Sequence, residues 1–216
     1  MLSFIAKVAW AALMCICVES FQYGAPFVMT ASSPFASFLK PSIQNSLNLK
    51  KELLQKCIGT SNGVKASPEI RDEIASIVKR LEKVNAVKKI SSSKKMNGNW
   101  KLIYTTNDGS SAGKLGPFVG RVDQEIDVST KRYKNFVRLG LLTGVLTATW
   151  DNLDEKLWRV KFLDIEFKAF GITLTKKPLN ALGTWRMSYL DDSLRILYAA
   201  GSTGKENIYV LTRESF

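Results

Sequence analysis

The hydrophobic pattern of the chain changes at residue 98. From Gly98 to Thr106, in the sequence GNWKLIYTT, Trp100, Leu102 and Tyr104 fall on one side of a period-two element and the intervening residues on the other. This alternation is typical of a β-strand with one buried face. Glycine permits a sharp bend before the strand, and the Asn-Asp-Gly sequence after it is typical of a turn. We expect this stretch to be the opening strand of an antiparallel barrel.

Eight more strand candidates follow the first. Turn sequences such as Asp151-Asn152 and Asp191-Asp192 separate most of them. Short strands at near-regular spacing predict a mostly β fold, an up-and-down barrel or a sandwich of about eight or nine strands in residues 97–216. The further candidates are Val119–Val128, Tyr133–Leu139, Gly144–Trp150, Trp158–Leu163, Ile165–Thr175, Gly183–Leu190, Leu194–Ala199 and Ile208–Arg213.

The neighbouring carboxylates of Asp191 and Asp192 allow two interpretations. Paired acids can divide the roles of general acid and general base. Adjacent residues of a strand point to opposite faces, however, and this pair lies between two strand candidates, so a hairpin turn is favoured. Arg195 is close enough in the sequence to pair with one of the two.

The segment before the first strand has helical periodicity. Apolar residues at positions 49, 53, 54, 57 and 58 share one face of a short helix, Leu49–Ile58. A second helix has a clear start, because Ser67 can cap it and Pro68 suits its first position. Its apolar stripe runs from Ile70 to Val84, and such stripes are usually part of a core. We expect this helical lead-in, residues 49–96, to pack on the barrel as one domain with it.

Two targeting segments are expected ahead of the helices. Val8–Val18 is an unbroken apolar run, too short to span a bilayer but suited to a signal peptide of residues 1–20, with an uncleaved anchor as the alternative. Residues 21–48 lack Asp and Glu and are rich in Ser and Thr, which is transit-peptide composition. Together they resemble the two-part leader that directs proteins to plastids enclosed by extra membranes. A secreted protein is the alternative.

Composition narrows the possible functions. The 216 residues carry a net charge of +12, and residues 50–96 hold twelve Lys or Arg against five Asp or Glu. This basic segment fits an anionic surface, either lipid headgroups or nucleic acid. The chain has no histidine, and of its three cysteines Cys15 and Cys17 fall in the expected leader. Histidine-dependent mechanisms, the usual catalytic zinc sites, an internal disulfide and a cysteine metal cluster are therefore excluded for the mature chain.

Four blocks resemble the plastid lipid-associated proteins, or fibrillins. GNWKLIYTT is similar to an opening G-x-W-x-L-x-Y-T-T, and the helical lead-in also matches. Trp185–Ile196 is similar to a T-Y-L-D-x-x-L-R-I block with Ser188 in place of Thr, and Ile208–Arg213 to a closing F-V-L-x-R with Tyr209 in place of Phe. The resemblance implies a lipocalin-like barrel of the plastid, found on thylakoids or plastoglobules. It also implies that the protein binds or coats apolar lipids such as prenylquinones and carotenoids, without a cofactor.

Alternation gives eleven candidates for a lipid-binding barrel interior. In the alternative interpretation these side chains simply fill the barrel, which large aromatic residues favour. By resemblance to lipocalins, the late Arg213 is expected to lie over the early Trp100 and close the barrel base in a structural role. The interior candidates are Trp158, Val160, Phe162, Ile165, Phe167, Trp185, Met187, Tyr189, Leu194, Ile196 and Tyr198.

Three classes of function remain. The leading hypothesis is a non-enzymatic protein that binds an apolar lipid or coats a lipid-droplet or membrane surface peripherally, with the basic helical segment helping it to dock. The second is a lipocalin-type enzyme acting on a lipid or carotenoid through inward carboxylates, with Asp123, Glu125 and Glu166 as candidates. The third, a nucleic-acid binder, is disfavoured because the aromatic residues alternate with charged ones instead of lining an exposed basic groove.

Overall fold

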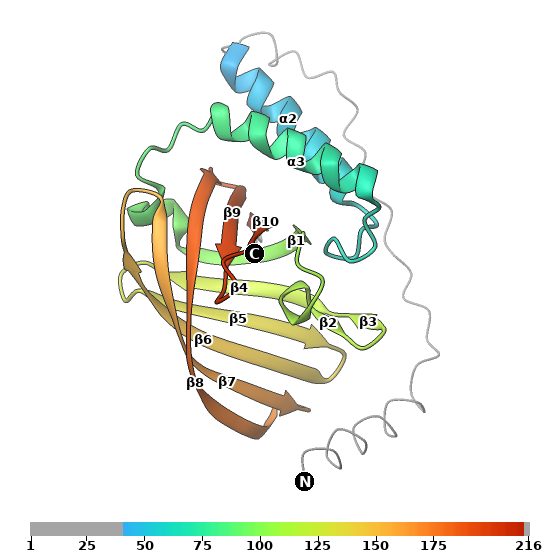
Figure 1. Ribbon diagram of the computed structural model, residues 1–216, viewed down its shortest axis with the longest axis vertical. Coiled ribbons are helices and arrows are strands. Elements are labelled where there is room, and N and C mark those ends of the chain that lie inside the picture. Colours follow the sequence, from blue (N-terminus) through green and yellow to red (C-terminus); the bar gives the residue numbers. More distant parts are fainter. Residues whose placement is uncertain (1–40, 214–216) are drawn as a thin grey trace. The chain divides into compact units, whose positions relative to one another are not determined.

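Within residues 41–213, eight strands enclose a barrel and two helices precede them in the chain (Figure 1). We describe residues 41–213 in a computed structural model; the predicted signal peptide and residues 21–40 of the predicted transit segment lie outside this range. The helices are α2 (Pro41–Cys57) and α3 (Pro68–Lys83). Three single 3-10 turns, η2 (Ile90–Ser92), η3 (Lys94–Met96) and η4 (Ser110–Ala112), lie in the connections.

Eight strands form a closed antiparallel barrel in the order β1-β10-β9-β8-β7-β6-β5-β4, while β2 and β3 form a separate small hairpin. The expected fold class, a mostly β chain with an antiparallel barrel after two helices, is confirmed. The strands are β1 (Gly98–Thr105), β2 (Lys114–Leu115), β3 (Phe118–Val119), β4 (Arg121–Asp127), β5 (Arg132–Leu139), β6 (Leu142–Asn152), β7 (Leu157–Ala169), β8 (Ile172–Leu190), β9 (Leu194–Ala200) and β10 (Glu206–Arg213).

The division predicted between residues 158 and 175 is wrong. β7 runs unbroken past residue 163, where a bulge between Phe162 and Asp164 shifts its pairing with β8. The hairpin turn lies instead at Phe170 and Gly171, whose φ angles are 53° and 79°. The predicted strand Gly183–Leu190 is the second half of the long β8. A bulge interrupts the alternation of inward and outward side chains. The end of a strand interrupts the alternation in the same way, so the sequence pattern alone does not distinguish a bulge from a strand end.

Aromatic side chains fill the end of the barrel next to η2 and η3, which we call the base. Trp150 and Trp158 stack with ring centroids 4.1 Å apart, and Trp158 lies 6.3 Å from Trp185. Tyr133 meets Trp185 edge-on at 4.8 Å. The Trp158 indole donates a hydrogen bond of 2.9 Å to the carbonyl of Ser91, which ties η2 to the barrel. Each large ring thus has either an aromatic or a hydrogen-bonding partner, as buried aromatic residues require.

Both helices pack on the outside of the barrel through part of their apolar stripes, and of the predicted first stripe Leu54 and Ile58 are exposed. α3 begins as predicted, with Ser67 Oγ accepting from the amide of Ile70 at 3.4 Å. α2 begins at Pro41, earlier than the predicted Leu49. No helix within residues 41–213 has both the length and the apolar sequence needed to cross a bilayer. The core between helices and barrel consists of Leu49, Leu53, Cys57, Ile74, Ile77, Val78, Leu81, Tyr104, Tyr189, Leu194, Ile196 and Val210.

Two bulges turn side chains from the barrel interior toward the helices. The pairing register shifts between Leu102 and Tyr104 in β1 and between Met187 and Tyr189 in β8. Trp100 and Leu102 lie in the barrel core, whereas Tyr104 lies in the core beneath the helices. The prediction that these three residues share one face is therefore wrong for Tyr104, because the extra residue reverses the alternation.

Candidate functional site

A cavity of about 260 Å³ lies at the mouth of the barrel, the end opposite the base. The β5–β6, β7–β8 and β9–β10 turns form this end, together with the connection from β1 to β4. The interior is therefore hollow at the mouth and filled by side chains at the base.

One wall of the cavity is polar and the other is apolar. The polar wall comes from β10, β4 and β5 and from the segment after β1, and carries Asn107, Ser111, Gln124, Tyr133, Asn135, Asn207 and Tyr209. The apolar wall comes from β6 to β9 and the residue after β9, and carries Leu146, Phe162, Trp185, Leu197, Ala199, Ala200 and Gly201. A cavity with this division suits a ligand that has a polar end and a hydrocarbon part.

Seven of the eleven sequence candidates do lie on the strand positions that face the interior. Phe162 and Trp185 line the cavity. Trp158, Val160 and Met187 are buried in the packed core below it. Ile165 and Phe167 lie beyond the cavity on the extended part of β7, where Ile165 pairs with the cavity residue Leu146 and Phe167 is 46% exposed.

The prediction of an inward orientation is wrong for Tyr189, Leu194, Ile196 and Tyr198. All four pack in or against the core beneath the helices, and Tyr189 contacts Ser46 of α2 with its hydroxyl at 3.1 Å. The bulge in β8 reverses the orientation of Tyr189. On β9 the apolar residues of the predicted set face the helices, and the alternate set, which begins with Arg195, faces the interior.

Sequence reasoning missed the polar wall and the inward face of β9. Leu197 and Ala199 follow Arg195 at two-residue spacing, and both line the cavity. Tyr133 and Asn135 follow the same rule on β5. The available signal was a single arginine within the apolar run of β9. An arginine there indicates either a solvent-facing side or a buried cation, and the sequence does not distinguish them.

Arg195 is a buried cation within the barrel. Its side chain has no exposed surface, and its Nη2 donates a hydrogen bond to Oε1 of Gln124 on the polar wall. The guanidinium carbon lies 5.3 Å from the ring centroid of Trp100. Burial lowers the pKa of Arg195 to about 9. The positive charge of Arg213 also lowers this pKa, whereas the interaction with Tyr133 raises it. The side chain is therefore still protonated at neutral pH.

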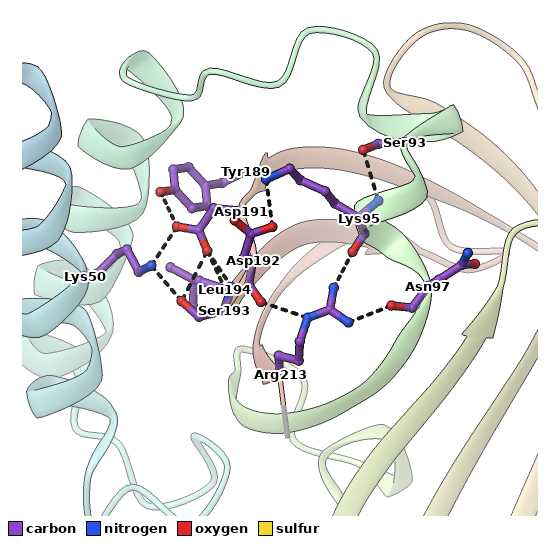
Figure 2. Close-up of polar contacts among 10 residues, drawn as sticks. All are labelled: Lys50, Ser93, Lys95, Asn97, Tyr189, Asp191, Asp192, Ser193, Leu194 and Arg213. Atoms are coloured by element: carbon purple, nitrogen blue, oxygen red, sulfur yellow. Dashed lines mark hydrogen bonds and ion pairs between the residues drawn. The ribbon is translucent and has the colours of Figure 1, made fainter. Parts of the chain in front are cut away.

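Arg213 lies at the base, at the end of β10. Its guanidinium carbon lies 4.3 Å from the ring centroid of Trp100, the pairing that the lipocalin resemblance implies. Figure 2 shows it donating to three backbone carbonyls, those of Asp192 at 2.7 Å, Asn97 at 2.6 Å and Lys95. A Cβ on Gly98 would lie 2.6 Å from Nη1 of Arg213, so glycine leaves the space that this side chain occupies.

The Asp191-Asp192 pair forms the β8–β9 turn, as predicted (Figure 2). Asp191 Oδ1 accepts from the amides of Ser193 and Leu194, each at 2.8 Å, and its Oδ2 pairs with Lys50 of α2 at 2.6 Å. Burial alone would raise the pKa of Asp191, but these hydrogen bonds hold the pKa below its ordinary value. The predicted pairing of Arg195 with this turn is wrong, because that side chain points into the barrel.

The three carboxylates proposed for an enzyme do not meet in the cavity. Asp123 is buried on β4 but pairs with Arg121 at 2.8 Å and with Arg138. Glu125 is exposed, and Glu166 accepts a hydrogen bond from Thr173. No Asp or Glu of residues 41–213 lines the cavity, and within the same range no three potential metal ligands gather.

Exposed apolar side chains lie on three of the connections that form the mouth, and we call them the apolar rim. Its six residues are between 45% and 73% exposed, although monomeric proteins usually cover such groups. The amide of Phe170 donates to the carbonyl of Leu141 at 3.0 Å, which joins two of the rim turns. The rim consists of Leu115 and Phe118 on the β2–β3 hairpin, Leu141 on the β5–β6 turn, and Phe170, Ile172 and Leu174 on the β7–β8 hairpin.

Comparisons with known proteins point in one direction. The PAP_fibrillin family model matches residues 47–174. The probable plastid-lipid-associated protein 5, chloroplastic, of Arabidopsis thaliana is 31% identical over 171 residues, which are 76% of this chain and 68% of that protein. Plastoglobulin-1, chloroplastic, of Pisum sativum is 32% identical over 85 residues, 39% of this chain and 24% of that protein. No solved structure matches the chain.

Proposed function

Because the chain belongs to the PAP_fibrillin family, we propose that it is a non-enzymatic lipid-binding protein of the plastid that docks on a lipid surface through the mouth of its barrel. The surface is that of a thylakoid or a plastoglobule. Prenylquinones, carotenoids and related lipids are the expected ligands. The predicted two-part leader provides the route into the plastid.

The apolar rim carries this proposal. A lipid surface covers exposed hydrocarbon without requiring a complementary protein partner, and the rim spans three separate turns at one end of the barrel. Transferring the side chains of Phe170 and Ile172 into lipid would contribute roughly 3 kcal/mol or more in total. With the rim in lipid, the cavity opens directly toward the source of its ligand.

The size of the cavity supports uptake from a surface over transport of a whole lipid. At about 260 Å³ it falls below the roughly 300–1,000 Å³ typical of sites that enclose a small molecule. It therefore accommodates the polar end or ring of a long lipid, while the remaining hydrocarbon lies along the rim. Such a ligand is held jointly by the protein and by the lipid surface.

The basic helical segment is expected to contribute less than its net charge indicates. Five of its cations have acidic partners, and three of these acids lie outside the segment, so the pairs bring the local charge below the net charge of residues 50–96. These ion pairs are Lys50–Asp191, Lys56–Glu73, Arg80–Glu52, Lys89–Glu155 and Lys95–Asp192. Docking through the rim is hydrophobic, so it should persist at high salt.

Flotation with lipid vesicles tests the proposal. The purified protein should float with vesicles at both low and high salt, whereas the double variant Phe170→Asp/Ile172→Asp should lose most of the bound fraction. Leu153→Asp is the matched control, because Leu153 is 44% exposed but lies on the β6–β7 turn at the base. Equal flotation of the rim variant and the wild type would contradict docking through the mouth. Flotation abolished by salt would assign docking to the basic helices.

A further inference from the structure

Arg195 has no acidic partner among residues 41–213. Its single hydrogen bond goes to the neutral amide of Gln124, and its Nε and Nη1 groups are buried without a partner in the described chain. A buried guanidinium normally pairs with a carboxylate, because an isolated charge removed from water is strongly disfavoured. The barrel therefore contains a positive charge and unused donors that residues 41–213 do not balance.

The groups around Arg195 do not replace the missing negative charge. Gln124 of β4, Tyr133 of β5 and Trp100 of β1 face it across the barrel. Its partners in register on β8 and β10 are Leu190 and Leu211. The other charge that acts on it is the guanidinium of Arg213, which is also positive. In addition, Arg213 lies closer to the Trp100 ring, so the base already has a cation in contact with its indole.

Arg195 lies next to the cavity. Gln124, which accepts its hydrogen bond, is part of the polar wall, and so is Tyr133. Leu197, the next inward residue of β9, lines the cavity as well. Arg195 itself does not line the cavity, so a ligand reaches its guanidinium only if the Gln124 side chain moves aside. The guanidinium is thus bonded through Nη2 to a residue of the polar wall, and the opposite wall of the cavity is apolar.

We propose that Arg195 anchors the anionic head of a single-chain amphiphile, a carboxylate or a phosphate monoester, whose hydrocarbon chain runs along the apolar wall toward the rim. The anion replaces the Gln124 oxygen as acceptor and supplies the charge that the barrel lacks. This inference rests on the proposed function and adds an anionic class of ligand to the neutral lipids expected for the same cavity. One water molecule occupies roughly 30 Å³ in the liquid, so the cavity has the volume of on the order of nine water molecules. This is enough space for the anionic head of the amphiphile and the first carbons of its chain.

A matched pair of ligands tests the anchor. The probes are a fluorescent polyene fatty acid and its methyl ester, which share one hydrocarbon chain and differ in charge, and an alkyl phosphate serves as a competitor. At pH 7 the wild-type protein should bind the acid at least about tenfold more tightly than the ester, since a charged hydrogen-bonding partner contributes this much. Displacement of the acid by low concentrations of alkyl phosphate would assign the site to phosphate heads, and failure of displacement to carboxylates.

Variants of Arg195 separate the anchor from the hydrocarbon contacts. Arg195→Met should lower affinity for the acid to that for the ester and leave ester binding unchanged, while Arg195→Lys should retain part of the preference. Arg186→Met is the control, because Arg186 carries an ion pair with Glu206 on the outside of the barrel. Equal affinities for acid and ester in the wild type would overturn the anchor and leave lipid binding intact. If neither probe bound and the protein did not float, the proposed function would fail as well.

A measurement on the wild-type protein covers the case in which Arg195→Met does not fold. A fatty acid labelled with ¹³C at its carboxyl reports its own ionisation in the complex. Beside a guanidinium, the bound carboxyl should titrate well below its pKa in water, because a nearby opposite charge favours the ionised form. A bound carboxyl with an ordinary or raised pKa would overturn the inference, since hydrocarbon surroundings alone raise it.

Discussion

Trp100 has two arginine neighbours that differ in what surrounds them. Arg213 uses its donors on three backbone carbonyls at the base, whereas Arg195 retains two donors without a partner in the described chain. The first arrangement is that of a closed structural contact, because each donor group is satisfied. The arrangement around Arg195 is that of a binding site, because its unpaired donors can accept a ligand as their hydrogen-bond partner. The same residue type thus has two different roles within one barrel, and hydrogen bonding distinguishes them.

Replacement of Arg213 tests the structural role at the base. Arg213→Ala removes a cation–π contact and three hydrogen bonds, so we expect a loss of about 1–3 kcal/mol in the free energy of unfolding and a fall in Tm of several degrees. Arg213→Lys keeps the charge but not the planar donors, and should lie between the two. Thermal unfolding followed by circular dichroism measures both. An unchanged Tm for Arg213→Ala would contradict the closure.

At the scale of elements, the β8–β9 turn is the point where a helix, two strands and the base connect. Lys50 of α2 pairs with Asp191 of the turn, and Lys95 of η3 pairs with Asp192. These two neighbouring acids differ in exposure, since the Asp191 side chain is 29% exposed and the Asp192 side chain 84%. We therefore expect the turn to hold α2 through Asp191, with little contribution from Asp192.

Loss of the Asp191 charge should weaken the contact between α2 and the barrel. Asp191→Asn is expected to cost about 1–3 kcal/mol at pH 7, because it removes charged hydrogen bonds from Lys50 and two amides. Asp192→Asn should cost less than about 1 kcal/mol, as exposed ion pairs usually do. Denaturant unfolding of both variants measures the difference. Equal stabilities of the two would show that Asp191 does not hold the helix.

This contribution should depend on pH in one direction. The pKa of Asp191 is lower in the folded protein than its ordinary value, so its ionised form stabilises the fold above the unfolded pKa. As the pH falls through the folded pKa, both states become protonated and the stabilisation is lost. The stability difference between wild type and Asp191→Asn should therefore be constant near neutral pH and shrink in acid. A difference that grew in acid would contradict the assignment.

Strands and helices differ in how well the sequence predicts them. The alternation around Trp100 and the cap at Ser67 were sufficient to predict β1 and α3, because each depends on local chemistry. The orientation of Tyr104 and Tyr189 was not predictable in this way, since a single inserted residue in the strand reverses it. Bulges depend on pairing with a neighbouring strand, and one sequence pattern does not contain that information. The polar wall was missed for a related reason, because it gathers residues from non-consecutive strands.

At the scale of the whole molecule, the two ends of the barrel have opposite character. The base is filled by stacked tryptophans and holds the Arg213–Trp100 contact, while the mouth holds the cavity and carries the apolar rim. The helices cover one side through a core of their own. This polarity leaves one end of the described chain with both exposed hydrocarbon and access to the interior, and it is the basis for placing that end on lipid.

Hydrogen exchange with and without lipid vesicles tests that placement most directly. If the mouth faces lipid, amides of the β5–β6 and β7–β8 turns, residues 138–142 and 168–174, should become protected when vesicles are added, and the exposed faces of α2 and α3 should exchange as before. Protection confined to the two helices, with the turns unchanged, would contradict the account.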